Sequence, residues 1–510
     1  MRVPPRSAAL ACLLAVSGMA ATAAAGPVEV AERVRDWRMA HEQQLVDRFA
    51  ALLSIPNVAR DRAHIRRNAE HIGDLLEAAG MEVRLLEVAD ANPAVFAQRL
   101  VPGAARTVMI YIHYDGQPVN PADWASEPWT PVLRTDSVEN GGREVPMQGP
   151  FDPEWRIFAR SAGDDKAPII ALQGALQALA WAGLEPTVNL KVFLDGEEEA
   201  GSPNLRRVLE THAEALAADL WLFCDGPMHQ SRRPQLVYGV RGSYGLNLTV
   251  YGANRPLHSG HYGNWAPNPI LLLSELLLSM RDSSGQVLIE GFYDQVRGLS
   301  AAEQAAVDAS PRMDDLLKLE LGIAQPETGD RIEQAILRPG LNLRGISSGG
   351  VGAASRNAIH PHATASIGLR LVPDQTPAQL SAVLERHVRA QGFHILSAEP
   401  TPAERVRYPR LARLDWSGSG GYPAYRAPFD HPLARQVSAL LNELADGTLI
   451  QTPTMGGSLP IYIVDEVLAT PVLILPVANH DNNQHGANEN LRLQNLWDAI
   501  ETYAAVLTGL

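Results

Sequence analysis

Apolar residues recur along the chain at two different spacings. Residues 31–53 and 64–80 carry apolar side chains three and four positions apart, which predicts amphipathic helices. Residues 107–112 (TVMIYI) are almost continuously apolar, as expected for a strand covered on both faces. The same reasoning predicts strands at 82–87, 188–194 and 220–224, and helices at 166–182 and 205–217. Alternating strands and helices favour an α/β fold with a mostly parallel sheet flanked by helices.

The pattern changes near Val240. Residues 243–252 and 364–373 alternate strictly between apolar and polar, so one face of each strand is packed and the other is wet. The buried pattern returns after residue 420, with helices predicted at 432–444 and 491–507 and a strand at 471–476. We therefore expect a smaller α+β unit, 240–419, inserted between two parts of a larger catalytic domain, 26–239 and 420–510.

The first 25 residues have the features of a signal peptide. Arg2 and Arg6 precede an apolar stretch over 8–20, and small residues at 23–25 suit cleavage. The stretch is short for a permanent span, so we expect an exported protein, periplasmic or secreted, with no membrane attachment after cleavage. Lipidation of Cys12 is a minor alternative.

Composition and charge narrow the function classes. The 510 residues include 43 Lys and Arg against 57 Asp and Glu, a net charge of −14, with no run of basic residues. A nucleic-acid partner is therefore not expected. The mature chain has a single cysteine, Cys224, and hence no internal disulfide.

Histidine and carboxylate side chains follow the predicted buried strands. In open α/β sheets, ligands bind beyond the carboxyl ends of the strands. Mixed imidazole and carboxylate donors suit zinc, with manganese or cobalt possible, and two cations can share one carboxylate. Hydrolysis also needs a carboxylate that binds no metal and acts as a general base. The five segments that supply such residues contain His113 and Asp115, Asp164 and Asp165, Glu197–Glu199, Asp225, and His480 and His485.

Further motifs occur in a fixed order around these residues. They are Arg160-Ser-Ala-Gly-Asp164-Asp165-Lys166, Gly196-Glu-Glu198-Glu199-Ala-Gly201-Ser202, Leu257-His258-Ser259-Gly260, Arg370-Leu-Val-Pro373, Gly456-Gly457-Ser458 and His485-Gly-Ala-Asn488-Glu489. With His113-x-Asp115 and Asp225, the ordered set resembles the M20 metallopeptidase family, most closely its carnosinase and cytosolic nonspecific dipeptidase branch.

The resemblance implies a role for each matching residue. Glu198 is the expected general base, and Asp115 is expected to orient His113. His258 is expected to stabilise the oxyanion in the site of a partner subunit, which implies a homodimer formed through the inserted unit. The expected metal ligands are His113 and Asp225 for one ion, Glu199 and His485 for the other, and Asp164 bridging both; the expected substrate contacts are His258, Asn357, Arg370 and Ser458, with Arg370 binding the terminal carboxylate.

Two assignments have competitors. His480 lies close to His485 and competes for the ligand role, but the Asn488-Glu489 pair favours His485. In the run Glu197–Glu199, the choice of base and ligand depends on how the motif is aligned. Alignment on Gly201-Ser202 makes Glu198 the base and Glu199 the ligand. His229 has no partner pattern and is expected at the surface.

The expected function is that of an exported two-metal peptidase cleaving dipeptides or the C-terminal residue of short peptides. An N-acyl amino acid amidohydrolase with the same site is the alternative, because the sequence does not separate the two substrates. A non-catalytic binding protein on the same scaffold is a further alternative, although neither the base nor a ligand is missing. An aminopeptidase with a similar centre is disfavoured by the inserted unit that carries His258.

Overall fold

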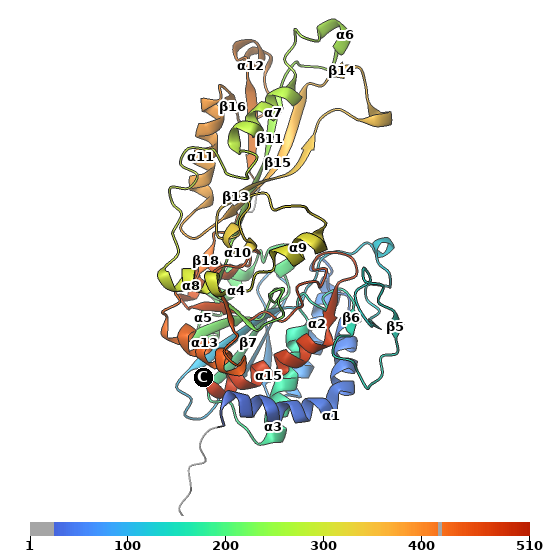
Figure 1. Cartoon of the computed structure of the whole chain (residues 1–510), viewed down its shortest axis with the longest axis vertical. Helices are drawn as coiled ribbons and strands as arrows, with labels where there is room; N and C mark the ends of the chain where they lie inside the picture. The colour runs from blue at the N-terminus through green and yellow to red at the C-terminus, as the bar shows by residue number, and fades with distance from the viewer. Residues whose placement is uncertain (1–24, 417–420) are drawn as a thin grey trace, which may run out of the picture.

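The chain forms a larger body and a smaller lid that stand end to end (Figure 1). The computed structural model describes residues 25–416 and 421–510, so almost all of the predicted signal peptide lies outside the described residues. Each unit has its own cluster of buried apolar residues. The chain passes from body to lid and back through two antiparallel strands, β10 (Gly239–Val240) and β18 (Tyr425–Arg426).

The body is built on a mixed sheet of eight strands. The four central strands are parallel, as predicted, whereas β1 and β2 pair antiparallel with each other and β2 with β7. The connection over 87–93 is too short for the helical crossover that parallel neighbours need. In spatial order the strands are β1 (Glu82–Leu86), β2 (Ala94–Arg99), β7 (Asn189–Asp195), β3 (Thr107–His113), β8 (Leu220–Phe223), β20 (Val472–Ile474), β9 (Gln235–Val237) and β19 (Ile450–Thr452).

Helices flank this sheet. Helices α1, α3 and α15 pack against one another, α13 packs on α15, and α4 packs on α14. The helix predicted at 205–217 is two short helices, because the backbone leaves helical geometry at His212 (φ −117°, ψ 23°). The helices of the body are α1 (Pro27–Leu53), α2 (Arg62–Glu77), α3 (Ala167–Ala182), α4 (Leu205–Thr211), α5 (Ala213–Leu216), α13 (Pro432–Leu444), α14 (Ile461–Leu468) and α15 (Leu493–Gly509).

A small antiparallel sheet joins two loops that are far apart in the sequence. Its central contact pairs β6 (Arg156–Phe158) with β21 (Asn490–Arg492). Asp164 follows β6 and His485 precedes β21, so this pairing brings both segments to the same place. On the other side of β6 lie β4 (Val132–Arg134) and β5 (Glu144–Val145).

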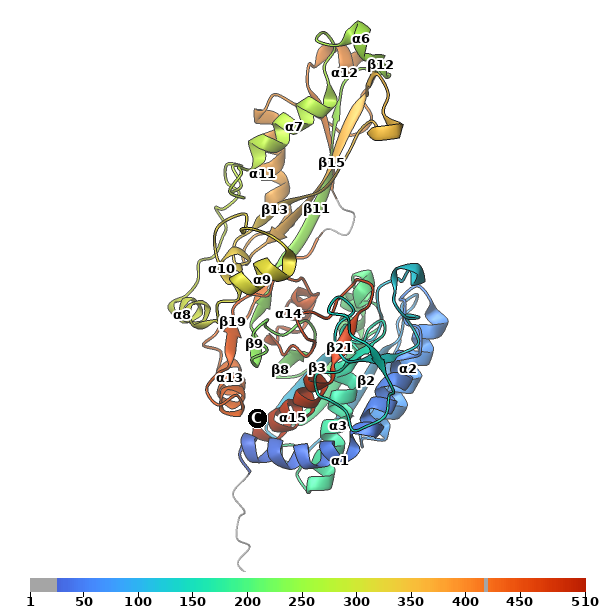
Figure 2. The same cartoon turned by 45° about the vertical axis from the view of Figure 1, so that its right-hand side comes forward.

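The lid is a five-stranded sheet with helices α7 (Pro269–Met280) and α11 (Pro377–Ala390). Burial alternates over residues 362–371 as the sequence predicts, with Ile367 buried and Ser366 partly exposed. The strict alternation predicted over 243–252 is wrong, because this strand lies between two others and residues 248–251 are all buried. The sheet order is β13 (Gly340–Ser347), β15 (His362–Leu371), β11 (Gly242–Tyr251), β17 (Leu411–Trp416) and β16 (His394–Leu396). Beyond its far end lie β12 (Leu257–His258), α6 (Ser259–Tyr262), β14 (Ala358–Ile359) and α12 (Pro402–Arg407) (Figure 2).

One part of the inserted segment lies against the body. Helix α8 (Ala301–Ala309) contacts β19, and residues of α10 (Ile332–Ala335) line a cavity of the body. Helix α9 (Asp314–Leu321) lies beside them at the junction (Figure 2). None of the helices within residues 25–416 and 421–510 combines the length and apolarity needed to cross a membrane.

Candidate active site

The candidate site lies at the edge of the body sheet where the central parallel strands end. His113 is the last residue of β3 and stands opposite Asp195 at the end of β7. Asp225 follows β8 by two residues. Because these strands are parallel, their carboxyl ends meet at one edge, and His113, Asp164 and Asp225 are all buried there.

Asp164 lies between two imidazoles. Its Oδ1 is 2.8 Å from His113 Nε2, and its Oδ2 is 3.1 Å from His485 Nε2. Asp225 Oδ2 lies 3.7 Å from His113 Nε2, and Glu199 Oε2 lies 3.3 Å from His485 Nε2. Donor atoms of His113, Asp164 and Asp225 fall within 4.8 Å of one another, as do those of Asp164, Glu199 and His485. Two groups that share Asp164 suit a pair of cations.

Negative charge accumulates at this edge. Burial, with repulsion from neighbouring carboxylates, raises the pKa of Glu198 well above its ordinary value, that of Glu199 to about 8 and that of Asp225 to about 6. The pKa of Asp164 is lowered despite burial, because His113 and His485 both interact with it. Its buried Oδ2 nevertheless has no hydrogen bond of good geometry among the described residues. Divalent cations would neutralise these acids, so the donor set fits metal ions.

Asp115 holds the loop that carries the two glutamates. Its carboxylate accepts hydrogen bonds from the backbone N–H groups of Glu198 (2.9 Å) and Glu199 (3.1 Å). The same carboxylate lies 3.5 Å from His113 Nδ1, whose nearer contact, at 3.2 Å, is the backbone oxygen of Asp115. Asp115 is therefore placed to orient the predicted base and one candidate ligand as well as His113.

Glu489 is a site residue whose role the sequence did not reveal. This fully buried carboxylate accepts hydrogen bonds from the backbone N–H groups of Ser161, Gly163 and Asp164, each 2.9 Å long. Arg160 donates to Glu489 at 2.7 Å and to the backbone oxygen of Gly486 at 3.0 Å. The pair thus ties the loop of Asp164 to the loop of His485. The only signal for this pair in the sequence is that Arg160 begins one motif and Glu489 ends another.

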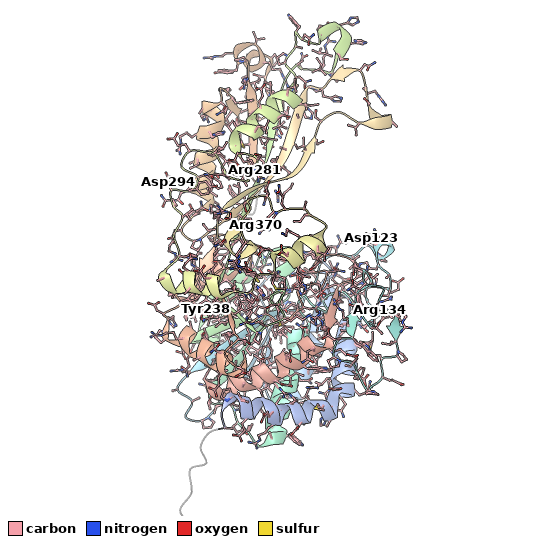
Figure 3. The ribbon with its side chains drawn as sticks, in the orientation of Figure 1. Asp123, Arg134, Tyr238, Arg281, Asp294 and Arg370 are labelled. Atoms are coloured by element: carbon pink, nitrogen blue, oxygen red, sulfur yellow. The ribbon has the colours of Figure 1, made fainter. Side chains whose placement is uncertain are left out.

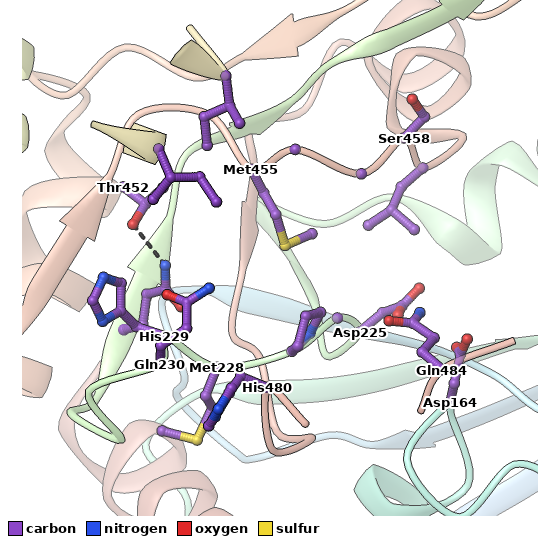
Figure 4. Close-up of a pocket in the computed structure, with 18 of the residues that line it drawn as sticks. Asp164, Asp225, Met228, His229, Gln230, Thr452, Met455, Ser458, His480 and Gln484 are labelled. Carbon is purple, nitrogen blue, oxygen red and sulfur yellow. Dashed lines mark hydrogen bonds between the residues drawn. The ribbon is translucent and has the colours of Figure 1, made fainter. Parts of the chain in front are cut away.

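These groups open into a cavity of about 530 Å³ at the junction of body and lid. Asp164, Asp225 and Glu198 line one end, and Figure 4 shows Asp164 and Asp225 close together there. Arg370 and Ser458 line the wall formed by the lid and the opposite loop, joined by a 2.8 Å hydrogen bond from Arg370 Nη1 to Ser458 Oγ. The cavity therefore combines a candidate metal centre with a cationic group.

The other two expected substrate contacts lie elsewhere. His258 and Asn357 are exposed neighbours, since β12 pairs with β14 and Ser259 N–H donates to the oxygen of Asn357. Figures 1 and 2 place these elements at the end of the lid opposite the body. Within one chain, His258 is therefore remote from the carboxylates.

Two further histidines, His480 and His229, lie near the site. His480 lines the cavity, but its Nε2 lies 3.8 Å from Glu320 and it belongs to neither donor group. His229 was expected at the surface, and this is wrong. It is only 7% exposed, and its Nε2 lies 3.5 Å from Glu333 Oε1. Glu333 comes from the segment that folds onto the body, a long-range contact that leaves no local pattern around His229.

Comparison with known proteins gives a consistent assignment. Residues 109–509 match the model of peptidase family M20/M25/M40. The Cys-Gly metallodipeptidase dug1 of Schizosaccharomyces pombe is 26% identical over 488 residues, which cover 92% of this chain and 96% of the relative. The Beta-Ala-His dipeptidase of Homo sapiens is 22% identical over 510 residues, 94% of this chain and 92% of that protein.

A solved structure shows the same architecture. The M20 family metallo-carboxypeptidase Sso-CP2 from Sulfolobus solfataricus superposes with a TM-score of 0.72 at 25% identity, covering 90% of this chain and 97% of that one. The family match spans most of the chain, and the strand-end acids and imidazoles lie inside it. The chain therefore belongs to peptidase family M20/M25/M40, in the branch of the carnosinases and Cys-Gly dipeptidases, and is a hydrolase of peptide bonds.

Proposed function

We propose that this protein is an exported two-metal dipeptidase that hydrolyses dipeptides or removes the C-terminal residue of short peptides. The observation that carries the proposal is a single cavity that is lined by Asp164, Glu198, Asp225 and His485 and also by Arg370 and Ser458. The relatives named as Cys-Gly and Beta-Ala-His dipeptidases support dipeptides as the substrate class.

The donor set suits two divalent ions, zinc by preference and manganese or cobalt as alternatives. His113 and Asp225 would hold one ion, Glu199 and His485 the other, and Asp164 both. When bound, such ions supply Lewis-acid chemistry that polarises the scissile carbonyl and activates water. Glu198 belongs to neither donor group, so its carboxylate is free to take a proton from the attacking water and pass it to the leaving amine.

Arg370 is placed to bind the carboxylate of the departing residue. Arg370 lines the cavity. In the part of the chain that the structure describes, no carboxylate oxygen lies within 4.0 Å of its guanidinium, whose hydrogen-bond partner is Ser458. A planar guanidinium matches a carboxylate through two parallel hydrogen bonds. Ser458, already bonded to Arg370, orients that group.

His258 acts, in this proposal, on the site of a second copy of the chain. Its position at the free end of the lid supports this, since it does not reach the carboxylates of its own body. The lid also exposes Leu271 (62%) and Leu278 (75%) on α7 and Ile346 (60%) on the edge strand β13, an apolar surface suited to pairing. His258 of the partner subunit would then donate a hydrogen bond to the oxyanion.

Export is the remaining element of the proposal. It rests on the basic, apolar and small-residue segments of residues 1–25. Expression with and without these residues, followed by fractionation, tests it. The full chain is expected outside the cytoplasm at a mass reduced by the leader, and an uncleaved chain retained with the cytoplasm would contradict it.

Metal removal and a substrate panel test the activity. Chelation followed by dialysis is expected to abolish hydrolysis of Cys-Gly and β-Ala-His, and added zinc, manganese or cobalt is expected to restore it. N-acetyl amino acids in the same panel examine the deacylase alternative. Full activity after verified metal removal would refute the two-metal mechanism, and turnover of the N-acetyl compounds alone would refute the dipeptidase assignment.

A further inference from the structure

Three arginines gather on the polar face of the lid sheet, and one of them, Arg370, lines the cavity. Arg370 lies at the junction between lid and body (Figure 3). Arg241 and Arg344 lie on either side of it, close enough that the charge of Arg370 helps to lower the pKa of Arg241 and the charge of Arg344 helps to lower that of Arg370. None of the three has a carboxylate oxygen within 4.0 Å among residues 25–416 and 421–510, and their polar contacts are the backbone oxygens of Arg338 and Ile367 and the hydroxyl of Ser458.

The placement of Arg344 depends on a bulge and two glycines. The register of β13 against β15 shifts between Leu343 and Gly345, so Arg344 sits in a β-bulge, a feature that re-aims a side chain. Its side chain lies over Gly368 and Gly245, which face each other across β15 and β11. A Cβ at Gly368 would lie 3.1 Å from Arg344 Cδ, and one at Gly245 would lie 2.7 Å from Arg344 Nη2. Side chains at these positions would fill the space that Arg344 occupies.

A third glycine, Gly340, leaves space for the side chain of Arg241 on the other side of Arg370. Gly340 pairs with Arg370, and a Cβ there would lie 3.1 Å from Arg241 Nη2. Burial and the charge of Arg370 lower the pKa of Arg241 to about 10, and burial and the charge of Arg344 lower that of Arg370. Asp415, an acid on this face of the sheet, is bound to Arg413 at 2.7 Å. The cluster therefore holds positive charge that no side chain nearby neutralises, in a chain whose net charge is −14.

The spacing suits an anion with two separated charges. The side chain of Arg344 lies over Gly368. Gly368 and Arg370 are two residues apart on the same face of β15, which corresponds to roughly 7 Å along the strand. Arg241 donates to the backbone of Arg338 and is partly buried, whereas Arg344 is exposed and lies near Arg370, which lines the cavity. One carboxylate on Arg370 leaves Arg344 free for a second carboxylate attached through a short aliphatic chain.

We propose that Arg344 forms a subsite for an acidic side chain, so that the preferred substrates end in glutamate or aspartate. The proposal rests on the proposed function, in which Arg370 binds the terminal carboxylate of the departing residue. Arg344 then binds the side-chain carboxylate of that residue, a charge-assisted contact that the corresponding amide cannot form.

Matched pairs of dipeptides test the subsite. We expect the kcat/KM of the wild-type enzyme to be roughly tenfold or more higher for Ala-Glu than for Ala-Gln, or for Ala-Asp than for Ala-Asn. Arg344→Gln is expected to reduce that ratio to near one. Arg389→Gln, which removes an exposed arginine from α11, is the matched control and should keep the wild-type ratio. A wild-type ratio below two in both pairs, or an undiminished ratio in Arg344→Gln, would overturn the proposal.

A binding measurement separates this subsite from the proposed function. Calorimetry with the zinc-loaded protein compares L-glutamate with L-glutamine and needs no turnover. Tighter binding of glutamate by the wild type, lost in Arg344→Gln, supports the subsite even if no dipeptide is cleaved. Equal binding of the two amino acids would overturn it even if neutral dipeptides are good substrates.

Discussion

The body and the lid carry their functional residues in different ways. In the body, His113, Asp115, Asp164 and Asp225 are at most 3% exposed and are held by strand ends and backbone hydrogen bonds. In the lid, His258 and Asn357 are exposed and share a tip far from the body. The body thus assembles a candidate centre within one chain, whereas His258 and Asn357 of the lid do not reach that centre in the same chain.

This difference follows from how each sheet is covered. Helices surround the body sheet, so its polar side chains concentrate at the strand ends. There His113, Asp164 and Asp225 pack against one another, away from solvent. The lid sheet leaves one face polar and open, and Arg370 lies on that face. Changes in the body should therefore alter chemistry, and changes in the lid should alter recognition and assembly.

Replacing the predicted base should have the largest effect. Glu198→Gln keeps the shape and removes the carboxylate, so we expect kcat to fall by about 100- to 10,000-fold. Metal content by elemental analysis should stay at the wild-type level, because Glu198 belongs to neither donor group. Glu185→Gln, at an exposed ion pair with Arg99, is the control and should leave kcat unchanged. A Glu198→Gln enzyme with near-normal kcat would remove the base from the mechanism.

Mixing two inactive variants tests whether the lid serves a second subunit. His258→Ala should lower kcat by about 100- to 1,000-fold through loss of an oxyanion donor. Mixed with Glu198→Gln, it should regain activity, because a hybrid dimer contains one site with both groups intact. The neighbouring exposed His261 provides the control substitution, His261→Ala. Restored activity would show that the site is shared, and a fully active monomer would exclude it.

Core substitutions test whether the two units are independent. Leu248 is fully buried in the lid core and Ile110 lies in the body core. Truncating either to alanine should cost about 2–5 kcal/mol of the unfolding free energy of its own unit. Calorimetry should then show two transitions, with Leu248→Ala lowering one and Ile110→Ala the other. A single transition shifted by both variants would mean that body and lid unfold together.

The smallest expected effect concerns an ion pair beside the His485 loop. Burial disfavours the charged form of Asp481, but hydrogen bonds from Arg156 (2.7 Å) and Asn479 (2.8 Å) hold the pKa of this carboxyl below its usual range. A lowered pKa stabilises the fold above the unfolded value of about 3.9, and this contribution is lost as the pH falls below it.

Asp481→Asn should accordingly cost about 1–3 kcal/mol of the free energy of unfolding at pH 7. The difference from the wild type should shrink as the pH falls below about 4. Urea unfolding across this pH range measures it, with the exposed Asp47→Asn as control. A difference that does not change with pH would assign the effect to packing rather than charge.

Much of the secondary structure could be read from local patterns. The run TVMIYI and the alternation over 364–373 correspond to β3 and β15, because burial on two faces or on one leaves a distinct periodicity. The antiparallel strand β2 and the bulged strand β13 were not anticipated, since their pairing depends on the neighbours they meet in the fold. Nothing in the sequences of helices α8 and α10 indicates that they lie against the body.

The sequence by itself determined which residue types follow each buried strand, and hence that imidazoles and carboxylates could meet at one edge. That much is local, because hydrophobic periodicity sets where a strand ends. Only the tertiary structure decided that Glu489 and Arg160 join the loops of Asp164 and His485, that His229 meets Glu333, and that Arg344 lies beside Arg370. These contacts join segments that the folded backbone brings together, and their geometry depends on strand register and on space left by glycines, neither of which is encoded by neighbouring residues.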